Sequence, residues 1–488
     1  MSTSPLSDGF LWPSHPRLTL LTPEDVRQIH YASLEILERT GVKVLHPEAL
    51  ELLKAAGADV RDAASVKIPS CLVQDALQRA PKRITVYDRE GRPAMYLQGT
   101  NTHYGMGTDT KYVIDIHSGE RRQVVLDDVA KAALICDNLP NIRFSASMGG
   151  AAAHEINPKI SDRFNFVQQL FNTTKPILFT SWAIDGMKDI YEMATAVCGG
   201  PENFRNRPFI IQYAEPITPL THPADSLAKL LFCADKGIPL VYVSGPIMGA
   251  TAPATLAGAI TLSNAEFLTG LVIAQLKRPG APVITGGGSA PLDMKTSVYM
   301  YVGPEAWLCN IALKELAVFY GLPDFNTGGC SDAKVLDQQA AHEVGFSILQ
   351  AALAGSSMVH DVGYLESGLT ACWELLVLAD EIIEANKYFM KGICVNRETL
   401  AVDLIHKIGV EGNFLSESHT MQHFKDVWYP RCFDRNSYHV WEQKGAKPLG
   451  TVLNEKAKWI ITHHQPKELA PAIRQQIDAI LDRAQNSV

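Results

Sequence analysis

The sequence predicts an α/β protein built on a (β/α)8 TIM barrel, with a helical segment before the barrel and a helical tail after it. The first observation is an alternation, from about Asn141 onward, of short β-rich runs and helical segments. The second is that each run ends in glycine or polar residues. The third is size, since 488 residues with 46% hydrophobic side chains can bury a core of this kind. Such an alternation implies right-handed βαβ units on one parallel sheet.

The first eighty residues predict a helical preface. Thr22, Pro23 and Asp25 supply an N-cap, a proline in the first turn and an acidic residue near the helix start. Shorter helices are expected at 47–56 and 69–79. Short β-rich runs at 84–87, 94–98 and 112–116 then predict a small antiparallel insert. We assign residues 1–140 to this N-terminal elaboration.

Seven β-rich runs predict the strands of the barrel. They lie at 142–148, 176–182, 209–214, 240–244, 283–286, 324–327 and 357–360. Helical segments are expected between them at 163–172, 189–197, 224–236, 256–276, 305–320 and 338–354. A closed barrel needs one more strand, which is expected either within 96–107 or beyond Ile393.

The barrel is assigned to residues 141–395, ending with a helix at 370–390, and the tail to 396–488. Helices are expected in the tail at 400–407, 418–426 and 468–483. Because no Pro/Gly/Ser-rich linker precedes the tail, we expect it to pack against the barrel and not to form a separate domain.

Composition and charge exclude several classes of protein. A formal net charge of -8, with acidic and basic residues interspersed, disfavours nucleic acid and anionic membranes as partners. Residues 1–8 hold no export signal. The apolar segment 256–276 contains Glu266 and is interpreted as a buried amphipathic helix, not a membrane span. Nine singly scattered cysteines indicate reduced thiols in a cytoplasm, with neither a disulfide framework nor a clustered zinc site.

The segment 326–366 carries the candidate chemical groups. In barrel enzymes the active site lies at the carboxyl ends of the strands. In this segment those ends supply Cys330, Asp332, His360, Asp361 and Glu366. An adjacent imidazole and carboxylate can act as acid and base, ligand or anchor. A zinc site would need Cys330, His360 and a further ligand. Phosphate-binding, nucleophile-elbow and metalloprotease motifs are absent from the sequence.

Aromatic residues at the same strand ends favour a cation site. Trp182, Tyr213, Tyr242 and Tyr364 follow or end predicted strands, and Tyr104 lies in a glycine-rich segment. Several aromatic faces with a carboxylate can hold a quaternary ammonium, which donates no hydrogen bond, through cation–π contact. Ordinary core packing is the alternative and is expected for about two of these five residues.

Several motifs resemble the trimethylamine/glycine betaine corrinoid methyltransferase family. They are Gly328-Gly329-Cys330-Ser331-Asp332-Ala333-Lys334, Asp337-x-Gln339, Ala351-Ala352-Leu353-Ala354-Gly355, Gly363-Tyr364-Leu365-Glu366-Ser367-Gly368-Leu369-Thr370, Thr40-Gly41-Val42, Phe414-Leu415 and His419-Thr420. The resemblance implies a barrel that binds a methylated amine and presents one methyl to the Co(I) corrinoid (cobalamin type) of a separate protein. Archaeal trimethylamine members carry pyrrolysine, whereas this chain holds only the twenty standard residues, as do relatives that demethylate glycine betaine.

On that resemblance we expect a methyltransferase for a quaternary amine. The cysteine usage indicates a cytoplasmic location, and a homo-oligomer is expected because large barrels commonly associate. Glycine betaine is the first expected substrate, and proline betaine, carnitine and γ-butyrobetaine are the alternatives. Tyr104, Tyr213 and Tyr364 are the expected cage, with Asp332 or Glu366 as the carboxylate. His360 is expected to bind the substrate's polar end, and His360 and Asp332 are the catalytic candidates. No tightly bound metal is expected.

Two other functions remain open at this point. The first is a metal-assisted barrel lyase or hydrolase that acts on a small carboxylated compound through His360 and Asp361, with a metal at Cys330. The second is a non-catalytic quaternary-amine binding protein, since a cage that holds the cation need not transfer its methyl group.

Overall fold

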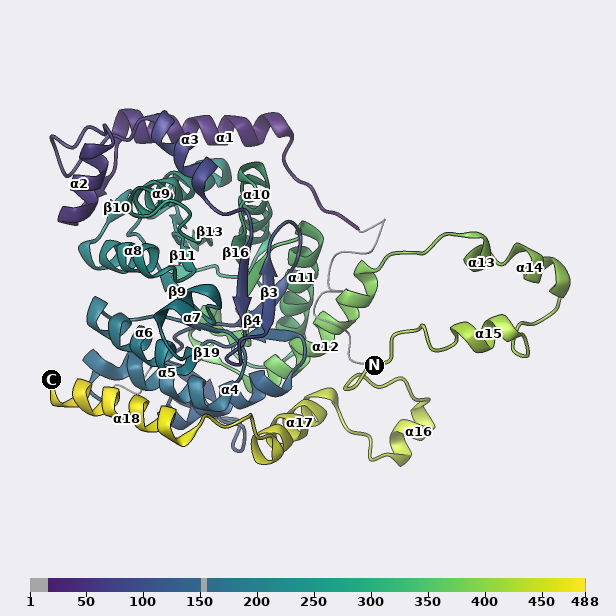
Figure 1. The fold of residues 1–488 in the computed structure, drawn as a ribbon. Helices are drawn as coiled ribbons and strands as arrows, with labels where there is room; N and C mark the ends of the chain where they lie inside the picture. The colour runs from purple at the N-terminus through teal and green to yellow at the C-terminus, as the bar shows by residue number, and fades with distance from the viewer. Residues whose placement is uncertain (1–15, 151–155, 488) are drawn as a thin grey trace.

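The computed structural model describes residues 16–150 and 156–487, and a closed parallel barrel lies at its centre (Figure 1). The start of the chain, where no export signal is expected, lies outside the described residues. The barrel strands are β4 (His103–Met106), β7 (Ile142–Phe144), β8 (Ile177–Phe179), β9 (Ile210–Ala214), β11 (Leu240–Tyr242), β13 (Val283–Gly286), β16 (Asp324–Thr327) and β17 (Met358–Val362).

Neighbouring barrel strands are hydrogen-bonded in chain order, and β4 joins β17 to β7. The ring closes between β7 and β8, where Ser145 forms a parallel bridge with Ile177. There the Ser145 amide donates to Pro176 O at 2.8 Å, and the Leu178 amide donates to Ser145 O at 2.8 Å. The predicted (β/α)8 barrel is confirmed.

The strand that was missing from the sequence pattern is β4. It falls inside the 96–107 segment and therefore comes from the part of the chain before residue 141. The strand has the sequence His-Tyr-Gly-Met, without a β-branched residue, so it lacks the aliphatic run that marks most of the other strands. A Cβ on Gly105 would stand 2.3 Å from the Phe144 ring, so glycine is required for β7 to pack against β4.

Helices surround the barrel. They are α4 (Leu126–Asn138), α5 (Ser161–Asn172), α6 (Ile184–Cys198), α7 (Pro201–Asn206), α8 (Ala224–Lys236), α9 (Leu256–Lys277), α10 (Pro304–Tyr320), α11 (Gln338–Ala354) and α12 (Trp373–Met390). Left-handed glycines end four of them: Gly199, Gly237, Gly321 and Gly355. The helix α4 was not anticipated from the sequence.

The N-terminal helices α1 (Pro23–Glu35), α2 (Pro47–Ala55) and α3 (Ser70–Arg79) cover the outer side of α9. Among the described residues α9 is the one helix long and apolar enough to cross a membrane, yet 78% of its most apolar window is buried in the protein. It is thus a core helix, as predicted. The amphipathic pattern expected for it is wrong, because α1 to α3 bury the face that would otherwise meet solvent.

Short strands form small sheets beside the barrel. The hairpin of β2 (Ile84–Tyr87) and β3 (Pro93–Leu97) precedes β4. A second sheet joins β5 (Tyr112–Ile114) and β6 (Arg121–Gln123) to β18 (Tyr364–Leu365) and β19 (Thr370–Ala371). The antiparallel insert is therefore divided in two by a barrel strand. The remaining small strands are β1 (Lys43–Val44), β10 (Thr221–His222), β12 (Ile247–Met248), β14 (Ala290–Asp293) and β15 (Val298–Tyr299).

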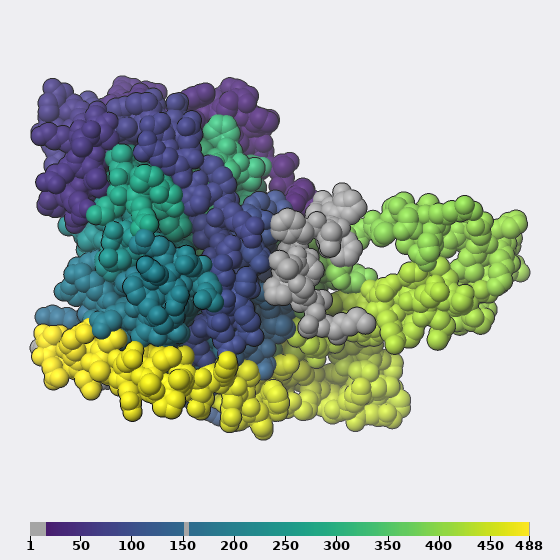
Figure 2. All heavy atoms as spheres, viewed as in Figure 1, coloured from purple at the N-terminus to yellow at the C-terminus, as the bar shows by residue number. Residues whose placement is uncertain are grey.

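The C-terminal tail has two parts. Helices α17 (Leu449–His463) and α18 (Pro471–Asn486) pack against α12, α4 and α6, as the sequence predicts for the tail. Residues 391–448, which we call the arm, instead extend away from the barrel in an outgoing and a returning limb (Figures 1 and 2). The returning limb meets α12 where the amides of Arg431 and Cys432 donate to Glu381 Oε1 at 2.6 and 3.1 Å. The arm holds α13 (Arg397–Leu400), α14 (Val402–Ile408), α15 (Ser418–His423) and α16 (Tyr438–Gln443). None of its residues is buried.

Candidate active site at the barrel mouth

Four tyrosines gather where the carboxyl ends of β9 and β17 meet the β14–β15 hairpin. This tyrosine cluster consists of Tyr213, Tyr299, Tyr301 and Tyr364. The Asp361 carboxyl acts electrostatically on all four hydroxyls, and burial raises the pKa of each tyrosine. Two of the expected cage residues, Tyr213 and Tyr364, are therefore brought together around one carboxyl group.

An irregularity in β17 allows His360 and Asp361 to meet although they are consecutive. The register with β4 shifts between Val359 and Val362, and Asp361 has a left-handed φ of 75°. In a regular strand neighbouring side chains point to opposite faces. Here His360 Nε2 lies 3.0 Å from Asp361 Oδ2, and both side chains are buried.

Both ring nitrogens of His360 are engaged within the protein. Nδ1 donates to Asn326 O at 2.7 Å, and Nε2 faces the Asp361 carboxyl. The ring stacks on Phe325 with the centroids 3.9 Å apart. Neither nitrogen is left for the polar end of a substrate, so the geometry gives His360 the role of holding Asp361 in place.

The Asp361 carboxyl is held by several donors in a desolvated position. Burial raises its pKa, while the neighbouring His360 and hydrogen bonds from Tyr301 and Thr327 act in the opposite direction. The Tyr301 hydroxyl donates to Oδ2. Asp361 is thus a buried carboxyl next to aromatic faces, which is the arrangement that suits a cation without hydrogen-bond donors.

A second carboxyl, Glu215, was not singled out in the sequence. It receives a hydrogen bond from the Tyr213 hydroxyl, and Asp361 acts on it electrostatically. Glu215 is solvent-accessible, yet desolvation by the surrounding protein raises its pKa. A side chain that lines the wall of a deep recess satisfies both observations. Its position two residues after Tyr213, at the end of a predicted strand, is the signal that could have identified it.

The other carboxylates proposed from the sequence are committed to loop contacts. Asp332 Oδ2 accepts the Val302 amide at 3.0 Å, and Oδ1 accepts the Ser367 hydroxyl at 2.9 Å. Glu366 forms a two-point ion pair with Arg121, with Oε2–Nε at 2.7 Å and Oε1–Nη2 at 3.0 Å. Glu366 is thereby neutralised, whereas Asp332 adds negative charge near Tyr299.

Three aromatic candidates lie outside the tyrosine cluster. The Tyr104 hydroxyl donates to Ile348 O of α11 at 2.8 Å, so its ring packs between the sheet and the helix layer. The Tyr242 hydroxyl pairs with His222 Nδ1 at 2.9 Å, also away from the cluster. Trp182 is 60% exposed and donates from Nε1 to Ser161 Oγ at 2.8 Å, which puts it at the rim.

A small cavity of about 100 Å3 lies on the β4 and β8 side of the mouth. Asp109, Ser147, Thr180 and Trp182 line part of it. Asp109 accepts hydrogen bonds from Ser147 Oγ at 3.0 Å and Thr180 Oγ1 at 2.7 Å, and burial raises its pKa. Asp109 also acts electrostatically on Tyr364, so the cavity adjoins the tyrosine cluster.

The side chains around Cys330 do not form the zinc site that was considered from the sequence. Burial raises the pKa of the Cys330 thiol, and Asp361 and Asp332 raise it further, which disfavours the thiolate that binds metal. His360 has no free nitrogen. Within residues 16–150 and 156–487, the one group of three or more possible ligands close enough to share an ion lies elsewhere, in the arm.

Several known proteins resemble this chain along nearly its whole length. Residues 8–488 match the family described as trimethylamine methyltransferase (MTTB). The trimethylamine methyltransferase MttB of Methanosarcina barkeri is 33% identical over 485 residues, covering 96% of this chain and 95% of that protein. A glycine betaine methyltransferase of Desulfitobacterium hafniense (strain Y51) is 30% identical over 474 residues, covering 96% and 97%. The crystal structure of the Methanosarcina barkeri monomethylamine methyltransferase (MtmB) superposes with a TM-score of 0.52 over 94% of this chain and 90% of that chain, at 9% identity.

Proposed function

The chain belongs to the trimethylamine methyltransferase (MTTB) family, and from that membership we propose that it transfers a methyl group from a quaternary amine to the Co(I) corrinoid of a partner protein. It is a methyltransferase of a family whose members act on methylamines or betaine. Glycine betaine is the first candidate substrate, because one full-length relative is a glycine betaine methyltransferase.

The observation that carries this proposal is the tyrosine cluster with its two carboxyls. A trimethylammonium group binds aromatic faces and negative charge and needs no hydrogen-bond acceptor. Tyr213 and Asp361 act on Glu215. Asp361 in turn is influenced by His360, Tyr301 and Thr327, and none of these described groups is lysine or arginine. The recess is therefore suited to a cation.

The proposed reaction needs no general acid. The C–N bond breaks with its electron pair on nitrogen, so the leaving amine is neutral and takes up no proton. When docked at the mouth, the partner's corrinoid would supply the Co(I) nucleophile that accepts the methyl group. The residues of this chain bind the cation, orient one methyl group toward the mouth and keep water away from it. In this scheme His360 positions Asp361, and Asp332 holds the loops together.

Exposed apolar side chains at the rim support docking of the corrinoid protein over the mouth. Trp182, Ile217 and Met294 are 60%, 60% and 67% exposed. The first two lie in the loops after β8 and β9, and Met294 lies in the turn between β14 and β15. Exposed apolar groups gathered at a site favour a protein partner. Such a partner would also close the recess to solvent during transfer.

A methyl-transfer assay tests the proposal. The protein is mixed anaerobically with cob(I)alamin and with glycine betaine, proline betaine, carnitine or trimethylamine, and methylcobalamin is followed by its absorbance. We expect product with at least one betaine. Calorimetric binding of a betaine without any methylcobalamin would instead support the non-catalytic binding protein, since the same recess would serve that function.

We also propose a reducing cytoplasmic location and a homo-oligomer. All nine cysteines lie among the described residues and are free, which fits a compartment that keeps thiols reduced. The arm exposes large apolar side chains, including Ile393, Val410 and Leu415, that a second copy could cover. Light scattering on the purified protein measures the oligomeric state.

A further inference from the structure

The arm lacks a hydrophobic core of its own. None of residues 391–448 is buried, and the longest of its four helices, α14, has 7 residues. Isolated helices shorter than about 12 residues are marginal in water. Segments that cannot bury enough apolar surface are commonly held by a disulfide or a metal ion, and the arm's cysteines are free.

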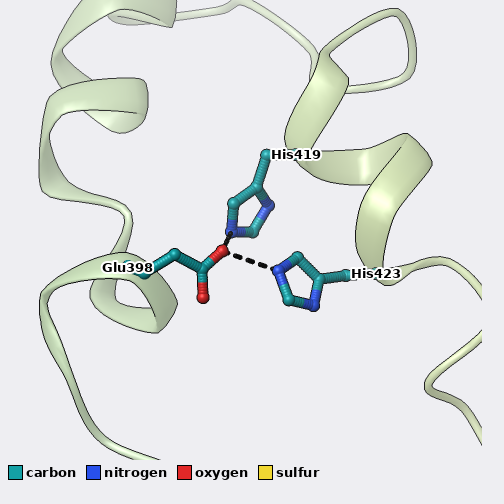
Figure 3. A group of neighbouring side chains, drawn as sticks. All are labelled: Glu398, His419 and His423. Carbon is teal, nitrogen blue, oxygen red and sulfur yellow. Dashed lines mark hydrogen bonds and ion pairs between the residues drawn. The ribbon is translucent and has the colours of Figure 1, made fainter.

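Three side chains from the two limbs of the arm point toward one another (Figure 3). Glu398 comes from α13 on the outgoing limb, and His419 and His423 come from α15 on the returning limb. The two histidines are four residues apart and lie on one face of the helix. Glu398 Oε1 lies 2.7 Å from His423 Nε2 and 3.6 Å from His419 Nε2, and all three ligand atoms lie within 4.8 Å of one another.

A fourth residue orients one of the histidines. Asp426 Oδ2 lies 2.7 Å from His423 Nδ1, on the opposite side of the ring from Glu398. Histidines that bind metal usually donate their other ring N–H to a carboxylate or carbonyl, which fixes the tautomer. Asp426 would therefore leave the lone pair of His423 Nε2 directed at the centre of the group.

His419 gives an independent indication of a ligand site. Its Nε2 is shielded from solvent and has no hydrogen-bond partner, because Glu398 at 3.6 Å is too far for one. An ion pair of His423 with Glu398 and Asp426 would account for those three residues without a metal. It would leave the His419 nitrogen buried and unpaired, which costs free energy.

We propose that Glu398, His419 and His423 bind a Zn2+ ion that clips the two limbs of the arm together. Two imidazoles and one carboxylate are a zinc-type ligand set, and a fourth position would be filled by water or by a partner protein. The site lies in the arm and does not depend on the methylated substrate. The proposal departs from the expectation of no tightly bound metal, which rested on the family resemblance and applied to the whole protein.

Metal analysis of the full-length, untagged protein tests the site. After dialysis against Zn2+ and removal of free ion, we expect about one zinc per chain. The variants His419→Ala, His423→Ala and Glu398→Gln should lose it, whereas the exposed His439→Ala in the same arm should keep it. Asp426→Asn should keep the ligands but weaken zinc affinity about 10- to 100-fold. Zinc below a tenth of an equivalent in the wild-type protein, or equal loss in His439→Ala, would overturn the proposal.

Limited proteolysis tests the clip. The arm has no buried residues, so packing does not protect it from proteases. If zinc holds the two limbs together, cleavage within 391–448 should be slow with zinc and at least about tenfold faster after chelation or in His419→Ala. His439→Ala should be cleaved like the wild type. If zinc is lost and the cleavage rate does not change, the ion binds there but does not hold the limbs, and the clip is refuted.

Discussion

The hydroxyl of Tyr301 donates a hydrogen bond to the carboxyl of Asp361, and this contact joins the loop after β15 to the end of β17. It links an aromatic ring that was not expected at the site to the carboxyl at its centre. Burial raises the pKa of both groups, so the hydroxyl stays protonated and remains a donor. The loop is thus held over the mouth by the same bond that orients the charge.

Replacing Tyr301 with phenylalanine removes this bond and keeps the ring. Asp361 then loses a donor while it stays buried, which should lower the free energy of unfolding by about 1–3 kcal/mol. Thermal unfolding measures the change. Tyr299→Phe, on the same hairpin and without a described bond to Asp361, is the matched control. Equal melting temperatures for Tyr301→Phe and the wild type would show that the bond contributes nothing.

Glu215→Gln removes one charge from the recess and keeps the shape of the side chain. We expect calorimetric affinity for a betaine to fall about tenfold or more, which corresponds to at least about 1.4 kcal/mol. Glu202→Gln, on the exposed first turn of α7, is the control for loss of a distant charge. If a betaine binds Glu215→Gln as tightly as the wild type, Glu215 does not contribute to binding the cation.

Glu366→Gln tests whether one of the two carboxylates expected from the sequence binds the cation. Glu366 is paired with Arg121, and a partly exposed pair of this kind contributes about 0–1 kcal/mol. We therefore expect a small change in thermal stability and no change in betaine affinity. A loss of affinity as large as that of Glu215→Gln would show that Glu366 contributes to binding the cation.

Affinity for the cation should rise with pH. Burial raises the pKa of Glu215 and of Asp361, so each binds its proton more tightly than an ordinary carboxyl and ionises at higher pH. The cation prefers the ionised form, so affinity is lost as the pH falls through these raised values. The contribution of the same groups to folding has the opposite sign, since it is present at low pH and is lost as the pH rises through the folded-state pKa. Calorimetry between about pH 4 and pH 8 measures the first effect, and a flat profile would contradict it.

His360→Ala separates two roles for the histidine. If His360 positions Asp361, the variant should bind glycine betaine and the carboxylate-free tetramethylammonium ion more weakly by the same factor. If His360 instead binds the substrate's carboxylate, only glycine betaine should be affected. Titration calorimetry with both ligands measures the ratio, and a selective loss of glycine betaine binding would refute the positioning role.

Much of the barrel can be predicted from the sequence because its strands and helices have distinct apolar patterns. The bounds of β13, β16, α8 and α11 agree with the prediction residue for residue. The strand β4 was left as one of two alternatives, because its sequence His-Tyr-Gly-Met contains no β-branched residue and no aliphatic run. The helices α4 and α17 were missed, although Asp128 forms a capping contact at the start of α4.

The site is less predictable because it depends on contacts between distant loops. Tyr213, Tyr364 and Asp361 lie at strand ends, where parallel strands bring them together. Tyr299 and Tyr301 lie on a hairpin whose return over the mouth has no local signal. The bond from Tyr104 to α11 and the pairing of Glu366 with Arg121 likewise connect residues far apart in the chain.

The pairing of β4 with β17 sets the order in which the chain can fold during synthesis. Tyr104 is in register with Val359, so the ring of strands stays open until the chain beyond Val362 has left the ribosome. Through that interval β4 presents an unpaired edge, which is a site for wrong pairing and aggregation. We therefore expect nascent chains that stop before β17 to require chaperones, while the released full-length protein does not.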